Sequence, residues 1–156
     1  PKAFRSAGQG GGKPGPRSSW RVRSRRLRWY SMQCETLLAV VDDDEDVRAA
    51  LTRLIGSAGF AVESFASGGA FLRSVEDHKP ACVVLDLHMP EISGFDVQRS
   101  LGASHAAFPV VVITGHDTLQ SRVRAAQLGA KAYLCKPVND EALLAAIDAA
   151  IVGQSI

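Results

Sequence analysis

The stretch Cys82-Val83-Val84-Leu85-Asp86 places an acidic residue directly after four apolar ones. A short, continuous apolar run of this kind is typical of a β-strand that is buried on both faces. A carboxylate at the end of such a strand, with Met89-Pro90 close behind it, points to chemistry more than to packing. We therefore take this strand as the centre of the fold and Asp86 as the first candidate functional residue.

The same pattern recurs on both sides of this stretch. Leu37–Val41 is a second apolar run, and it ends in Asp42-Asp43-Asp44. Further strands are predicted over residues 60–65, 110–113 and 132–135. Segments with apolar residues at helical spacing alternate with the strands, at about residues 47–55, 67–75, 94–101, 117–128 and 139–151.

This alternation predicts an α/β fold: a flavodoxin-like, doubly wound, five-stranded parallel sheet with helices on both faces. For the strand order 2-1-3-4-5, ligands bind at the carboxyl ends of the strands, where the order reverses between strands 1 and 3. Those two strands end in Asp42-Asp43 and in Asp86. The predicted topology and the acidic residues therefore indicate the same place.

The charges divide the chain into two parts. Residues 1–31 hold nine of the 18 Lys and Arg and no acid, whereas the rest holds nine Lys and Arg against all 16 acids, a net charge of −7. Because the first part has few aliphatic residues, we predict a disordered basic leader over 1–35 and one folded domain over 36–153. The segment Arg21–Arg28 suits contact with nucleic acid or an anionic membrane. Because Met32 stands just before the ordered pattern, we favour the simpler interpretation that 1–31 is translated upstream sequence or a cloning remnant.

Other classes of protein are disfavoured. No run approaches 18 apolar residues, and no secretory signal is present, so we expect no membrane partner. The three cysteines, at positions 34, 82 and 135, contain no CxxC pair. An odd number of cysteines without such a pair fits a reducing compartment, and we predict a cytoplasmic location. Nucleic acid is not an expected partner except through the leader.

The acids at the two strand ends form a candidate metal site. Asp42, Asp43 and Asp86 offer hard oxygen ligands of the kind that hold Mg²⁺, or Mn²⁺, together with water and a phosphate. Without a cation, these carboxylates would repel one another and raise their pKa values. A bound cation allows Asp86 to remain ionised and nucleophilic. Glu45 and Asp46 are interpreted instead as solvated acids that favour the start of a helix.

Two further polar residues end strands at the same predicted edge. Thr114 follows the fourth strand, where it is either an ordinary β-branched residue or a hydroxyl that faces the site. Lys136 follows the fifth strand, and we expect its ammonium to pair with Asp86 and then with a phosphoryl oxygen. Phosphoryl transfer depends mainly on positioning and charge neutralisation, which a metal and a lysine supply. An aspartyl phosphate is an established type of covalent intermediate.

The segments VVDDDEDVR, VVLDLHMPEISGFD, VVVITGH and GAKAYLCKPVNDEALLAAI occur in this order. Together they resemble the receiver domain of two-component response regulators over roughly residues 36–152. The spacings from Asp43 to Asp86, from Asp86 to Thr114 and from Thr114 to Lys136 all match that family. The residues within these segments are similar to those in the receivers of nitrogen-fixation and nodulation regulators.

The resemblance implies a role for each site residue. Asp86 matches the phosphoacceptor, which a sensor histidine kinase or a histidine phosphotransfer protein phosphorylates. The implied Mg²⁺ ligands are Asp42, Asp43, Asp86 and the backbone carbonyl of His88. Thr114 and Lys136 match the residues that bind the phosphoryl group, and Tyr133 matches the switch aromatic that moves inward with the threonine. The Lys136-Pro137 bond is expected to be cis.

His88 and His116 depart from the usual pattern. They occupy the second positions after Asp86 and Thr114, which in the family tune dephosphorylation by controlling the access of water. A metal-binding pair of these two histidines is an alternative. Phosphorylation is expected to change the face formed by strand 4, helix 4 and strand 5, to which an unknown downstream protein or a second copy of the chain would bind.

Three kinds of output remain open. The first is a stand-alone receiver that acts by protein contact or as a phosphate relay, and the second is the truncated receiver of a DNA-binding transcriptional regulator. The third is a phosphotransferase or hydrolase similar to the haloacid dehalogenases, which requires a second Asp where this chain has His88. We expect a phosphoacceptor that autohydrolyses its aspartyl phosphate, and not a classical enzyme. Only residues 152–156 follow the last predicted helix.

Overall fold

A computed structural model describes residues 35–104 and 108–154 of the chain. The predicted leader lies outside these residues except for Glu35, which is exposed. Strands and helices alternate along the described part. Their bounds are β1 (Leu37–Val41), α2 (Glu45–Ser57), β2 (Ala61–Phe65), α3 (Gly68–Ser74), β3 (Cys82–Asp86), α4 (Gly94–Ala103), β4 (Val110–Thr114), α5 (Leu119–Gln127), β5 (Ala130–Cys135) and α6 (Asp140–Val152).

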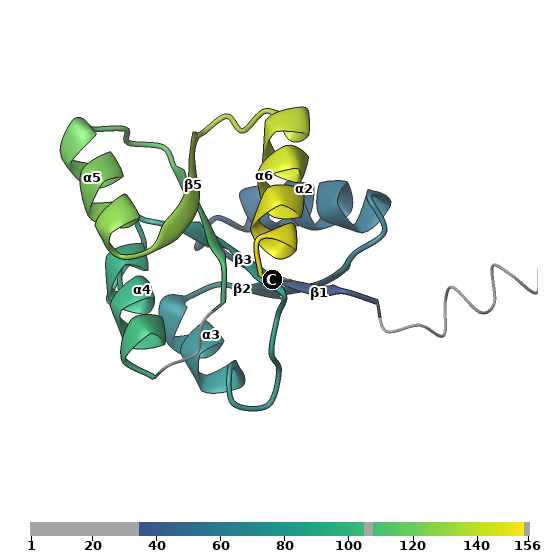
Figure 1. The fold of residues 1–156 in the computed structure, drawn as a ribbon, viewed down its shortest axis with the longest axis horizontal. Coiled ribbons are helices and arrows are strands. Elements are labelled where there is room, and N and C mark those ends of the chain that lie inside the picture. Colours follow the sequence, from purple (N-terminus) through teal and green to yellow (C-terminus); the bar gives the residue numbers. More distant parts are fainter. Residues whose placement is uncertain (1–34, 105–107, 155–156) are drawn as a thin grey trace, which may run out of the picture. The chain divides into compact units, whose positions relative to one another are not determined.

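The five strands form one parallel sheet in the order β2-β1-β3-β4-β5. Helices α3, α4 and α5 cover one face of the sheet, and α2 and α6 cover the other (Figure 1). The predicted flavodoxin-like, doubly wound fold and its strand order are therefore confirmed. The order reverses between β1 and β3, so the carboxyl ends of these strands lie at the switch point.

Alternate side chains of each central strand enter two separate cores. Leu38 and Val40 of β1 pack with Ile55 of α2 and Ile147 of α6. Val83 and Leu85 of β3, which face the other way, belong to the core that includes Phe71 of α3, Val97 of α4 and Ala125 of α5. Because β1, β3 and β4 contribute to both cores, their side chains are apolar at nearly every position.

Polar side chains mark the start of each helix. The N-cap residues accept hydrogen bonds from backbone N–H groups of the first turn, and they are Asp44, Ser67, Ser93, Thr118 and Asn139. Two of these caps, Ser67 and Asn139, are the first residues of the helical segments predicted over 67–75 and 139–151. Gly129, with a φ of 95°, lets the chain turn directly from α5 into β5, so β5 begins two residues earlier than predicted.

Helix α5 is held to the sheet by little apolar surface. Ala125 is its one buried residue, while Leu119 is 78% exposed and Val123 48% exposed. This helix is the fourth in the predicted order, so the expected signalling face consists of β4, α5 and β5. None of the described helices is long and apolar enough to cross a membrane.

We predict that Gly94→Ala destabilises the domain and displaces the loop after β3. A Cβ at position 94 would collide with the backbone oxygen of Asp86 and lie 2.8 Å from the Cα of Leu87. Overpacking of this kind costs about 1–3 kcal/mol. Urea unfolding would measure the loss.

Gly102→Ala is the matched control, because a Cβ there meets nothing within 4 Å and the residue lies in α4. It should leave stability unchanged or raise it by up to about 1 kcal/mol through helix propensity. Equal unfolding midpoints for the two variants would contradict the prediction.

Candidate functional site

Four strands deliver polar residues to one edge of the sheet. Asp42 follows β1 directly, and its N–H still bonds to Phe65 O at the end of β2, 3.1 Å away. Asp86 and Thr114 are the last residues of β3 and β4, and Lys136 follows β5. The structure therefore brings the predicted residues together at the carboxyl edge.

Three carboxylates of this edge form a compact group. One oxygen each from Asp42, Asp43 and Asp86 lies within 4.8 Å of the others. Asp42 is fully buried and Asp86 is 3% exposed, whereas Asp43 is exposed to solvent. Among the three, Asp43 is therefore the carboxylate that solvent reaches most readily.

Lys136 supplies the positive charge of the site. Its Nζ lies 2.7 Å from Asp42 Oδ2 and 3.6 Å from Asp86 Oδ2. Burial alone would lower the pKa of Lys136, but the hydrogen bond to Asp42 and the charges of both carboxylates raise it above its ordinary value. The expected pair with Asp86 is present, and the structure adds a closer pair with Asp42, whose side chain is fully buried. The expected cis bond between Lys136 and Pro137 is present.

Asp42 is fixed from both sides. Its Oδ1 accepts a hydrogen bond from Asp44 N, at 2.9 Å, and its carbonyl oxygen accepts one from Arg48 Nη1, at 2.8 Å. Its Oδ2 is buried, and the partner described for it is the Lys136 ammonium. The contact of Arg48 could not be read from the sequence, where this residue is distinguished only by its position one turn into the helix that follows the acids.

The carboxyl group of Asp86 binds its proton more tightly than an ordinary aspartate does. Its pKa is raised to about 6, first by burial and second by the negative charge of Asp42, while Lys136 and the His88 N–H act in the opposite direction. The His88 N–H lies 3.3 Å from Asp86 Oδ1. At neutral pH the carboxylate is therefore mostly ionised, and a further positive charge beside it would complete the ionisation.

The Thr114 hydroxyl is engaged by the two histidines. It accepts a hydrogen bond from His116 N at 3.0 Å, donates to His116 O at 3.2 Å, and lies 3.1 Å from His88 Nδ1. The two imidazole rings meet edge to face with their centroids 5.8 Å apart. Among the described residues, Asp42, Asp43 and Asp86 form the group that lies close enough together to hold a metal ion. Neither histidine belongs to this group. The predicted roles of His88 and His116 in tuning a reaction stay predictions.

The donor set fits Mg²⁺ or Mn²⁺. Three carboxylates face one ammonium, which leaves a net charge of −2 at the site when all four groups are ionised. Mg²⁺ prefers hard oxygen ligands and keeps several waters, and the exposed side at Asp43 has room for them. The backbone carbonyl of His88 stays a predicted further ligand.

Tyr133, the predicted switch aromatic, lies in the middle of β5 with its ring partly buried. The guanidinium of Arg122, in α5, stacks over this ring at 5.2 Å from the centroid. Arg122 was not among the residues that the sequence indicated, because a single arginine on an exposed helix has no distinctive pattern.

Residues 38–148 match the family described as the response regulator receiver domain. The chain belongs to this family. The receiver is 40% identical to the response regulator protein TodT of Pseudomonas putida over 116 residues, which are 74% of this chain and 51% of TodT. It is also 40% identical to the transcriptional regulatory protein FixJ of Azorhizobium caulinodans over 112 residues, which are 72% of this chain and 53% of FixJ.

A crystal structure described as FixJ-N superposes on the receiver with a TM-score of 0.73 at 35% sequence identity, covering 80% of this chain and 99% of that one. The chain spans about half the length of the curated relatives it matches. The similarity is therefore to the receiver portion of these proteins.

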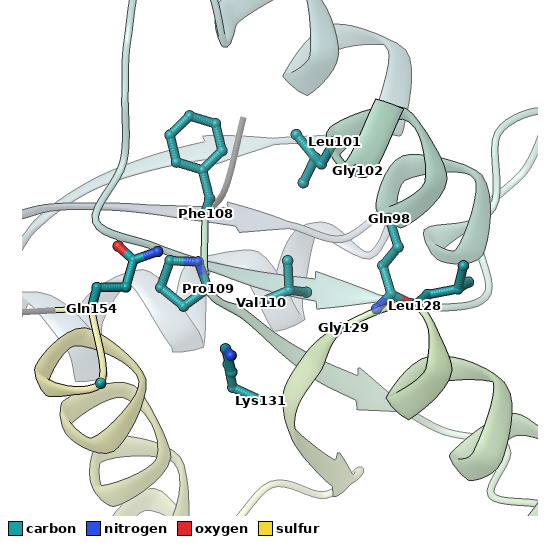
Figure 2. Close-up of a pocket in the computed structure, with 11 residues that line it drawn as sticks. Gln98, Leu101, Gly102, Phe108, Pro109, Val110, Leu128, Gly129, Lys131 and Gln154 are labelled. Carbon is teal, nitrogen blue, oxygen red and sulfur yellow. The ribbon is translucent and has the colours of Figure 1, made fainter. Parts of the chain in front are cut away.

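A separate cavity lies away from the acids. It has a volume of about 260 Å³ and is bounded by the starts of β4 and β5, at Val110 and Lys131, and by residues near the ends of three helices (Figure 2). Gln98 of α4 lines it, and its buried amide donates a hydrogen bond to Ala125 O of α5, at 3.1 Å. The cavity does not contribute to the receiver site, but this bond helps to hold α5.

We predict that Asp86→Asn stabilises the metal-free receiver, increasingly so as the pH rises from about 4 to 7. The pKa of Asp86 is higher in the folded protein, about 6, than in the unfolded chain, so its contribution is most favourable below the unfolded pKa and is lost as pH rises through the folded one. The difference corresponds to at most about 3 kcal/mol at neutral pH. Urea unfolding with a chelator present, at several pH values, would measure it.

Saturating Mg²⁺ should reduce this advantage, because the cation binds the folded wild-type protein through Asp86. A constant difference between the two proteins across this pH range would show that Asp86 does not carry a raised pKa.

Proposed function

We propose that this receiver is the phosphoacceptor of a two-component phosphorelay, with Asp86 as the residue that is modified. The donor would be a sensor histidine kinase or a histidine phosphotransfer protein. The observation that supports this most is the placement of Asp86, a buried carboxylate that is grouped with two further acids and paired with Lys136. Family membership supports the same assignment.

In the proposed reaction, a carboxylate oxygen of Asp86 attacks the phosphorus of a phosphohistidine. An O–P bond forms, the N–P bond breaks, and the electron pair returns to the imidazole nitrogen, which takes up a proton. When bound by Asp42, Asp43 and Asp86, Mg²⁺ supplies charge neutralisation for the phosphoryl oxygens. Lys136, held beside Asp86 by Asp42, is placed to contact a phosphoryl oxygen.

The proposed readout begins at Thr114. Phosphorylation adds about 1.5 to 2 negative charges and new hydrogen-bond acceptors next to the Thr114 hydroxyl. Donation to a phosphoryl oxygen requires this hydroxyl to release the carbonyl of His116, since it has a single proton. The loop after β4 would then shift and change the face of β4, α5 and β5, where a downstream protein or a second copy would bind.

We propose that the aspartyl phosphate is lost by autohydrolysis and that the chain is not a classical enzyme. A haloacid-dehalogenase-like reaction needs a second acid two residues after the nucleophile. His88 occupies this position, and its ring nitrogen contacts the Thr114 hydroxyl. This arrangement supports a role in controlling the lifetime of the phosphate.

A second candidate is the receiver portion of a DNA-binding transcriptional regulator. The supporting observations are that FixJ is described as a transcriptional regulatory protein and that this chain matches about half of its length. The genomic sequence downstream of Ile156 separates the candidates, since a continuing helix-turn-helix frame supports the regulator and a stop codon supports a stand-alone receiver.

We predict that Asp86→Asn abolishes phosphorylation by acetyl phosphate or by a cognate kinase in the presence of Mg²⁺. The amide cannot form the acyl phosphate, while the fold should persist because the two cores do not involve this side chain. Intact-mass spectrometry would detect the added phosphoryl group. Asp148→Asn, an exposed position on α6, is the matched control and should be phosphorylated normally. A labelled Asp86→Asn protein would refute the assignment.

We predict that His88→Ala changes the lifetime of the acyl phosphate more than it changes the rate of phosphorylation. One net hydrogen bond of about 1 kcal/mol corresponds to a factor of about five in a rate. His78→Ala is the matched control, because His78 is exposed and pairs with Glu63 of β2, away from the acids, so it should leave both quantities unchanged. An unchanged lifetime in His88→Ala would remove the role proposed for this residue.

A further inference from the structure

Arg122 joins two residues that lie far apart in the sequence. Its Nε and Nη2 donate to the two carboxylate oxygens of Asp117, at 2.9 and 2.7 Å. The same guanidinium stacks over the ring of Tyr133, and its Nη2 lies 3.8 Å from Cys135 Sγ. A planar guanidinium suits both contacts at once, because it binds a carboxylate in its plane and an aromatic ring on its face.

Asp117, Arg122 and Tyr133 belong to different parts of the proposed switch. Asp117 lies in the loop after β4, three residues beyond Thr114. Arg122 lies in the first half of α5, whose one buried residue is Ala125. Tyr133 lies in β5, at the edge of the sheet. The Asp117–Arg122 ion pair and the stacking of Arg122 on Tyr133 therefore link the loop, the helix and the strand of the face that is expected to change.

The hydroxyl of Tyr133 holds the ring only weakly. It is buried without a well-formed hydrogen bond in the described part of the chain, although the Asp117 carboxylate lies close enough to interact with it. Burial raises the pKa of Tyr133 most, and the charge of Asp117 and a weak hydrogen bond to that carboxylate raise it further. The hydrogen bond from Arg122 is the largest of the effects that hold the pKa of Asp117 at about 2, so the ion pair persists across the physiological pH range.

We propose that Arg122 is a positioning residue for Tyr133, and that the Asp117–Arg122 pair makes the Tyr133 ring follow the Thr114 loop. This inference rests on the proposed function, because the movement is the one that phosphorylation of Asp86 would drive.

The contacts of Thr114 and Asp117 indicate which arrangement of the loop the Asp117–Arg122 pair stabilises. As described, the Thr114 hydroxyl bonds to the backbone of His116, next to Asp117. A Thr114 hydroxyl that donates to a phosphoryl oxygen gives up its bond to the His116 carbonyl, and the loop that carries Asp117 moves with it. Arg122 is then drawn away from the ring. The pair therefore stabilises the arrangement in which Thr114 is bound to His116, and its removal should favour the arrangement bound to a phosphoryl group.

Beryllofluoride with Mg²⁺, a non-covalent mimic of an aspartyl phosphate, provides the test. Arg122→Gln should bind it about two- to fivefold more tightly than the wild type, the range that an exposed ion pair supports. Arg124→Gln is the matched control, since Arg124 lies on the same helix but stacks over Phe95, at 4.3 Å from that centroid. It removes the same charge and should leave the affinity unchanged.

A second readout follows the ring itself. The chain has two tyrosines, so 3-fluorotyrosine in a Tyr30→Phe background reports on Tyr133 alone by ¹⁹F NMR. The resonance of the free Arg122→Gln protein should lie closer to the beryllofluoride-bound position than that of the wild type. Asp117→Asn should act in the same way, and the double variant should add little to either single change, because both remove one interaction.

Each result has a distinct meaning. If the wild type binds beryllofluoride and Arg122→Gln matches Arg124→Gln in both readouts, the inference about Arg122 is overturned while the proposed function stands. Weaker binding by Arg122→Gln also overturns it, because the pair would then stabilise the bound arrangement. If the wild type shows no binding that depends on Asp86, the proposed function fails, and the inference fails with it.

Discussion

The receiver site depends on one balance of charge, in which the ammonium of Lys136 stands against three carboxylates at the end of the sheet. Two of the acids are buried, and a buried charge without a partner is strongly destabilising. Lys136 offsets this by lying between Asp42 and Asp86. The remaining negative charge is what makes the site suitable for a divalent cation and, after it, for a phosphoryl group.

The parallel sheet is what allows such a cluster to exist. Every strand ends at the same edge, so residues separated by almost a hundred positions, such as Asp42 and Lys136, meet without any long loop between them. The two apolar cores below the edge fix the strands, and the hydrogen bonds from Asp44 and Arg48 fix the first acid. The candidate site is thus carried by strands fixed in the cores, while the parts that respond in the proposed function are the loop after β4 and α5.

The sequence predicted the fold closely because its signals are strong ones. Short apolar runs that end in Asp86 or Thr114 are typical of buried strands, and their alternation with helical segments indicates a parallel sheet. The positions of the site residues followed from the strand ends. What could not be predicted depends on long, flexible side chains. The pairing of Lys136 with Asp42, the contact of Arg48 and the stacking of Arg122 are each decided by rotamers that leave no periodic trace in the sequence.

Helix α5 buries a single alanine, and its outward residues include two large apolar side chains. A core helix must preserve most of its apolar residues if the protein is to fold, but a helix anchored this lightly is under little such constraint. Its outer surface is therefore free to diverge between duplicated genes at almost no cost to stability. Under the proposed function, a change of partner at this helix would require no change of the acids or the lysine at the sheet edge.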